Sequence, residues 1–149
     1  MYSTMEDAYL QHGIEVPYRE NNNKYESTEQ DVLKFITNML ASLKYGTNPK
    51  EIGILFDKDA VLFGIFSGEF ITSNQKIVDY FRNFLQISGL RSDIPEKHSI
   101  QKMGDSIWGC YLYVPFHFGN KESIISRMTF ILENKHGDFQ INMLHGSIL

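Results

Sequence analysis

The sequence has one cysteine, no long apolar run and no cluster of basic residues, and each shortage excludes a class of protein. Cys110 cannot form an internal disulfide, and no pair of cysteines is present to hold a structural zinc ion. No stretch of about 18 uncharged apolar residues occurs, and the N-terminus lacks the apolar core of a signal peptide. We therefore expect an untargeted, cytoplasmic protein that does not enter a membrane.

The charge balance argues against nucleic acid as a partner. The formal net charge is -4 at pH 7, and Lys and Arg are scattered along the chain. Such a chain offers no basic patch for a phosphate backbone. Its 149 residues, 42% of them hydrophobic and 13% aromatic, are enough to build the core of one domain.

Residues 1–26 have no sustained apolar period and contain three consecutive asparagines, so we expect an N-terminal arm followed by a single domain over residues 27–149. A helix is predicted from Ser27, where Gln30 completes a capping box. A short second helix is predicted from Pro49 and a third from Asn74. Each has its apolar residues at helical spacing.

Extended segments follow the helices. A strand is expected over residues 59–66, and four more over residues 98–103, 106–118, 123–133 and 138–148. The turn residues between the last two strands, from Asn134 to Asp138, predict a hairpin. Helices first and a meander of long strands afterwards indicate an α+β fold, with the helices on one face of an antiparallel sheet.

The segment 106–118 is apolar or aromatic on both of its alternating faces. An antiparallel sheet covered on one side only should alternate apolar with polar residues. The pattern therefore predicts that a second sheet covers the other face, and we infer a homodimer, with a higher oligomer left open.

The order of these motifs resembles that of SnoaL-like proteins in the nuclear-transport-factor-2-like superfamily, over Glu29 to Ser147. The motifs are an Asp-x-Asp-Ala-Val-Leu strand from Asp57, an Ile-x-x-Tyr-Phe helix from Ile77, and a final hairpin with Arg-x-Thr-Phe and His-x-Ser. The chain is also similar to the association domain of calcium/calmodulin-dependent kinase II and its bacterial stand-alone relatives. The resemblance implies a cystatin-like cone of three N-terminal helices packed in a strongly curved antiparallel sheet, with a pocket at the wide end and dimerisation through the outer sheet face.

Two departures from the family pattern concern the pocket. The usual ending has two or three consecutive histidines and two serines, whereas this chain has His145 and Ser147 alone. Kinase-hub relatives place arginines in the cavity, and the matching positions here are Phe130 and Gly146. These departures do not favour an anionic ligand inside the cone.

Ketosteroid isomerases, polyketide cyclases and scytalone dehydratases share this fold, which implies acid/base chemistry in the cone. His145 follows Ile141 and Met143 at period two, so we expect it to point inward, as a general acid/base or as a hydrogen-bonded core histidine. Asp57 and Asp59 stand at a helix-to-strand junction, where a turn role is expected.

Four further side chains are candidates for lining the pocket: Arg127, Tyr80, Trp108 and His117. Arg127 stands among apolar residues of its strand and would hold either a ligand carboxylate or a structural partner. No histidine pair has metal-ligand spacing, so neither a metal nor a cofactor is expected.

These observations leave three functions. The first is a homodimer that binds a small apolar or carbonyl-containing molecule in the cone. The second is a cofactor-free isomerase, cyclase or dehydratase of the ketosteroid-isomerase type. The third is an oligomerisation or protein-interaction module, which a filled cone would favour.

Overall fold

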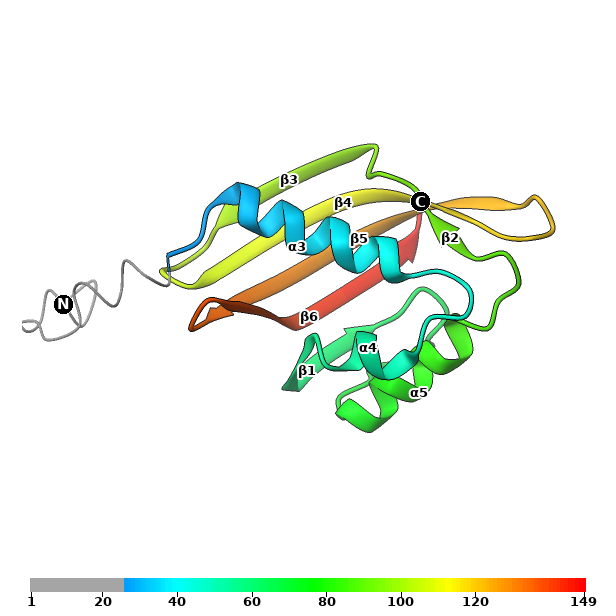
Figure 1. Cartoon of the computed structure of the whole chain (residues 1–149), viewed down its shortest axis with the longest axis horizontal. Coiled ribbons are helices and arrows are strands. Elements are labelled where there is room, and N and C mark those ends of the chain that lie inside the picture. The colour runs from blue at the N-terminus through cyan, green and yellow to red at the C-terminus, as the bar shows by residue number, and fades with distance from the viewer. Residues whose placement is uncertain (1–25) are drawn as a thin grey trace, which may run out of the picture.

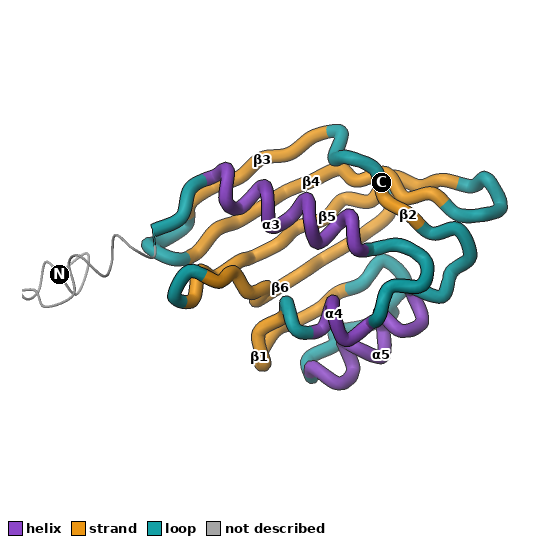
Figure 2. Tube along the Cα trace, in the orientation of Figure 1, coloured by secondary structure: helices purple, strands orange, loops and turns teal. Residues whose placement is uncertain are grey.

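A computed structural model describes residues 26–149, in which three helices and six strands form two layers (Figures 1 and 2). Residues 1–25 of the predicted arm lie outside the described residues. The helices are α3 (Glu29–Ser42), α4 (Pro49–Gly53) and α5 (Asn74–Phe84). The strands are β1 (Phe56–Phe63), β2 (Arg91–Ser92), β3 (Lys97–Lys102), β4 (Ile107–His117), β5 (Ser123–Lys135) and β6 (Asp138–Ile148).

Helix α3 begins with a capping box one residue later than the sequence predicts. The amide of Asp31 donates to Thr28 Oγ1 at 3.3 Å, and the amide of Thr28 donates to Asp31 Oδ2 at 2.9 Å. Two amide groups that would otherwise lack partners are thereby satisfied. Ser27, the predicted cap, instead accepts a hydrogen bond from Trp108 Nε1 at 3.0 Å, which ties the start of the helix to the sheet.

Helices α4 and α5 are joined by the side chain of Asn74, the first residue of α5. Asn48 caps α4 directly before the predicted start at Pro49, accepting from the Lys50 amide at 3.0 Å. Helix α5 is capped by Ser73 and not by Asn74. Asn74 Nδ2 donates to the Gly53 carbonyl at 3.1 Å and so fastens α5 to α4.

The sheet has the order β1-β6-β5-β4-β2, and β3 also pairs with β4. The predicted hairpin is confirmed: Lys135 pairs with Asp138, and the two residues between them, His136 and Gly137, have φ angles of 55° and 97°. Positive φ at both central positions is the requirement of a type I′ turn. In one detail the sheet differs from the expectation, because β1 joins the edge beside β6 and runs parallel to it.

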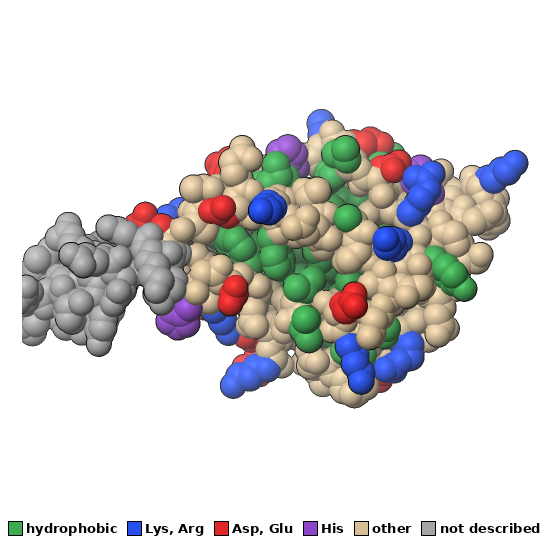
Figure 3. All heavy atoms as spheres, in the orientation of Figure 1, with side chains coloured by type: hydrophobic (Ala, Val, Ile, Leu, Met, Phe, Trp, Pro, Cys, Tyr) green, Lys and Arg blue, Asp and Glu red, His purple; other side chains and the backbone are tan. Residues whose placement is uncertain are grey.

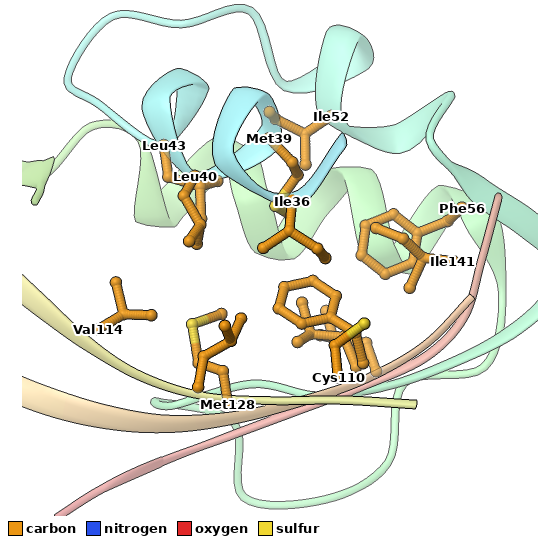
Figure 4. Packing of buried hydrophobic residues seen from close by; sticks show 14 of the residues in the cluster. Ile36, Met39, Leu40, Leu43, Ile52, Phe56, Cys110, Val114, Met128 and Ile141 are labelled. Atoms are coloured by element: carbon orange, nitrogen blue, oxygen red, sulfur yellow. The ribbon is translucent and has the colours of Figure 1, made fainter. Parts of the chain in front are cut away.

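The three helices lie on one face of the sheet, which we call the inner face. Figure 4 shows Ile36 and Leu40 of α3 above Cys110, Val114 and Met128 of the central strands. The other side is the outer face, and no helix of residues 26–149 packs on it (Figures 1 and 4). The α+β cone-type architecture predicted from the sequence is confirmed. None of the helices in these residues is both long enough and apolar enough to cross a membrane.

Candidate functional site: a filled cone and an exposed sheet face

The space inside the cone, where the sequence predicts a ligand pocket, is almost completely filled. A cavity of about 20 Å³ remains. It is lined by Leu43, Leu62, Phe63, Gly64, Ile65, Tyr80, Phe81, Phe84, Phe116, Met128, Leu144 and Gly146. A cavity of this size has room for about one water molecule. The lining contains no carboxylate and no histidine, and its one titratable side chain is Tyr80.

Aromatic rings account for the filling. The ring of Phe84 lies edge-on to that of Phe116, with centroids 5.9 Å apart and planes at 89°. Phe84 also stacks on Tyr80, with centroids 6.0 Å apart and planes at 17°. These are favoured aromatic geometries, and they hold the rings where a ligand would otherwise lie.

Tyr80 is the candidate pocket residue that does line the cavity. Its hydroxyl oxygen accepts from the Phe66 amide at 3.4 Å. Burial raises the pKa of Tyr80, and hydrogen bonds from the Phe66 and Ile65 amides offset part of that rise. A Cβ on Gly64 would lie 2.3 Å from the Tyr80 ring, so glycine is required for this close approach.

The expectation that His145 points into the cone is wrong. The pairing of β5 with β6 shifts register between Ile131 and Leu132, so that Ile141 and Leu144 are both buried. This bulge adds one residue to β6, and each later residue of the strand therefore lies on the opposite face of the sheet from the one that period-two counting predicts. His145 consequently lies on the outer face, exposed, with its ring 5.3 Å from that of Phe63.

Arg127 also lies on the outer face, and it is exposed rather than buried. Its Nη2 donates to the Ile148 carbonyl at 3.2 Å. It therefore does not enter the cone, and the prediction that it lines that pocket is wrong. Its position in the sheet is instead opposite Tyr113 of β4 and Ser147 of β6.

His117 and Trp108 do not line the cone cavity either. His117 Nε2 lies 2.6 Å from Asp93 Oδ2 at the end of β4, and Arg91 Nη1 is 3.1 Å from the other carboxylate oxygen. Trp108 is buried near the start of α3, with the Lys102 ammonium 5.9 Å from its ring centroid. Both side chains thus have structural partners within the chain.

Asp57, Lys135 and Cys110 have roles in holding the fold together. Lys135 donates a hydrogen bond to Asp57, which lowers the pKa of that carboxyl and raises the pKa of Lys135. Burial raises the pKa of Cys110 to about 12, which leaves it a protonated core residue. Within residues 26–149, no group of three or more His, Cys, Asp or Glu side chains is placed to hold a metal ion.

The outer face divides into an apolar part and a polar part. In one row across the sheet, Val61 pairs with Met143, Met143 with Ile131, and Ile131 with Gly109. Val61, Ile131 and Met143, together with Phe63, are half-buried, and we call these four residues the apolar strip. Four residues along each strand on the same face, the row consists of the polar or charged residues Lys97, Tyr113, Arg127 and Ser147. On the side of the molecule that bears α3, charged side chains of both signs are interspersed (Figure 3).

The polar part holds a second, larger hollow that sequence reasoning missed. It has a volume of about 420 Å³. It is lined by Lys97, His98, Ser99, Tyr111, Leu112, Tyr113, Arg127, Met128 and Thr129. The available signal was the alternation of polar residues along Lys97, Ser99 and Gln101, but their neighbours across the sheet follow only from the strand register.

A curved sheet packed on three helices, with its last strands in a long hairpin, defines a cystatin-like α+β protein. The sequence matches the model of the SnoaL-like domain over residues 46–149, more than half of the chain, and the chain belongs to that family. A comparison with curated protein sequences gives no match.

Solved structures with the same fold have low sequence identity to this chain. A proposed calcium/calmodulin-dependent protein kinase II association domain from Xanthomonas campestris has a TM-score of 0.74 and 22% identity, covering 83% of this chain and 89% of its own. The kinase II hub homology domain of Chlamydomonas reinhardtii has a TM-score of 0.67 and 14% identity, with 83% and 98% covered. A proposed ketosteroid isomerase from Parabacteroides distasonis has a TM-score of 0.66 and 16% identity, with 85% and 96% covered.

Proposed function

We propose that this protein is a homodimeric association module whose subunits pair through the outer faces of their sheets. The observation that carries the proposal is the filled cone, since a 20 Å³ cavity leaves no room for a substrate. The cavity lining also offers no carboxylate and no histidine, so the isomerase, cyclase or dehydratase alternative would have to rest on Tyr80 without a general base beside it in the lining.

The apolar strip is the part of the outer face that suits a partner. Its four side chains lie on neighbouring strands, and no described helix covers them. In a two-fold dimer the same patch meets itself, so a strip that crosses several strands can pair with its own copy. Two of the similar structures are named for association or hub domains, which agrees with this assignment at the level of the fold.

The second candidate function is binding of a small apolar or carbonyl-containing molecule inside the cone. One observation favours it. The Tyr80 hydroxyl accepts from the Phe66 amide, and no described residue accepts its own proton, which leaves that proton to polarise a carbonyl oxygen. A ligand would require the stacked rings to move apart, so this function demands a conformational change that association does not.

The association proposal is tested by the solution mass of two matched variants. Ile131→Asp places a carboxylate in the apolar strip, where a partner sheet would bury it without a counter-charge at a cost of several kcal/mol. Ile54→Asp is the control, because Ile54 is 73% exposed on the helix side. We expect the first variant to be monomeric at micromolar concentration and the second to keep the wild-type mass.

Melting curves of both variants separate loss of the dimer from loss of the fold. A monomeric Ile131→Asp protein that still melts cooperatively supports the proposal. If Ile131→Asp and Ile54→Asp have the same oligomer mass as wild type, the strip is not an interface and the proposal fails.

A further inference from the structure

The hollow on the outer face is large enough for a small molecule, unlike the cone. Its volume of about 420 Å³ lies within the range of about 300 to 1,000 Å³ that is usual for ligand sites. It lies between β3, β4 and β5 on the outer face of the sheet.

Two rows of the sheet give the hollow a regular chemistry. In one row, Lys97 and Arg127 stand on either side of Tyr113. In the next row, hydroxyl-bearing residues stand on either side of the second tyrosine, Tyr111. Those residues are Ser99 and Thr129. The floor thus carries two cations, four hydroxyl groups and two aromatic rings.

The positive charge of the hollow is not neutralised within the described chain. No carboxylate is among the lining residues, and the ion pairs of residues 26–149 involve neither Lys97 nor Arg127. The bond from Arg127 Nη2 to the Ile148 carbonyl fixes the side chain while engaging one of its donors. The other donors of the guanidinium remain available for a planar, bidentate acceptor.

The tyrosines suggest what the rest of the ligand is. Tyr111 is 39% exposed, a large value for an aromatic side chain in the middle of a sheet. A tyrosine ring offers an apolar face for stacking and a hydroxyl for a hydrogen bond. We propose that the hollow binds a small aromatic carboxylate, with the carboxylate held by Arg127 and Lys97 and its ring against Tyr111 or Tyr113.

This inference goes beyond the proposed association function and does not depend on it. The hollow lies between β3, β4 and β5, whereas Val61, Phe63 and Met143 of the apolar strip lie on β1 and β6. The fourth residue of the strip, Ile131, lies on β5 two residues beyond Thr129 of the hollow, so the two sites adjoin on β5 and otherwise occupy different strands of the same face. Oligomer mass is measured on the same samples as binding, so that failure of one proposal is distinguished from failure of the other.

The test compares benzoate with benzamide, which has nearly the same shape and no charge, by calorimetric titration at constant ionic strength. Wild type is expected to bind benzoate at least about tenfold more tightly than benzamide, since the charge-assisted bonds are lost with the amide. Arg127→Gln should lose this preference. The control is Arg82→Gln, which removes another exposed arginine, one that pairs with Asp79 on α5, and it should keep the preference.

Inorganic phosphate is titrated as the second probe, to test whether the aromatic ring matters. Weaker binding of phosphate than of benzoate supports the tyrosine contact. Equal affinities for benzoate and benzamide, equal loss in both arginine variants, or phosphate binding as tight as benzoate would each overturn the inference. If wild type is dimeric and shows no saturable benzoate binding, the inference fails while the association function stands.

Discussion

Phe116 is the residue whose removal most directly tests whether the protein fills its own cone. Its side chain is fully buried, packs edge-on against Phe84 and lines the remaining cavity. Phe116→Ala would join the space of one phenyl ring to the 20 Å³ already present. The result is a larger apolar cavity beside Met128 and the α5 aromatics.

The magnitude follows from two contributions. Losing the burial of the ring costs about 1.5–3 kcal/mol. A new cavity on the order of 100 Å³ adds about 2.4 kcal/mol at roughly 24 cal/mol per Å³. The total, about 4–5 kcal/mol, agrees with the range of about 3–5 kcal/mol for Phe→Ala substitutions in protein cores.

Urea unfolding at fixed protein concentration measures this loss, with Phe66→Ala as the control because Phe66 is 55% exposed. We expect a loss below about 1 kcal/mol for the control. Benzene should then raise the melting temperature of Phe116→Ala and leave wild type unchanged, because a dry apolar cavity of about 150 Å³ binds benzene and the new space approaches that size. Benzene stabilisation of wild type, or a Phe116→Ala cost no larger than that of Phe66→Ala, would refute the filled-cone account.

Three other changes test individual contacts. The hydrogen bond from Lys135 holds the pKa of Asp57 below its ordinary value of 3.8, so its stabilisation is present above about pH 3.8 and is lost as the pH falls through the folded-state value. Asp57→Asn should accordingly flatten the acid limb of the melting temperature plotted against pH, and an unchanged limb would contradict the pair. Gly64→Ala places a methyl group against the Tyr80 ring, so we expect a lower melting temperature than for Gly68→Ala, whose added Cβ meets nothing within 4 Å. Burial raises the pKa of Cys110 to about 12, so the native thiol should resist iodoacetamide at pH 8 and react only in denaturant; rapid native labelling would disprove this burial.

The elements encoded by local chemistry were predictable from the sequence. The turn at His136 and Gly137 needs positive φ, and residues that tolerate it are present, so the hairpin was predictable. The helices were likewise predictable from their capping residues and the spacing of their apolar residues, although the cap of α3 is Thr28 and not the predicted Ser27. Strand β2, with two residues, was too short to leave a pattern.

The site was less predictable because it depends on register and volume. Period-two counting placed His145 with Ile141, and a single bulge in β6 reversed that assignment. Nothing in the one-dimensional pattern distinguishes a cone lined by aromatic rings from one filled by them, because that difference is set by how Phe84 and Phe116 meet. The hollow was hidden for the same reason, since its cations come from strands on either side of β4.

Native mass spectrometry of the purified protein, under gentle and then denaturing conditions, tests the central claim most directly. The account predicts a species of twice the 17.3 kDa chain mass, with no small molecule released from the cone. A monomer, or a stoichiometric apolar adduct that Phe116→Ala and wild type carry alike, would contradict it.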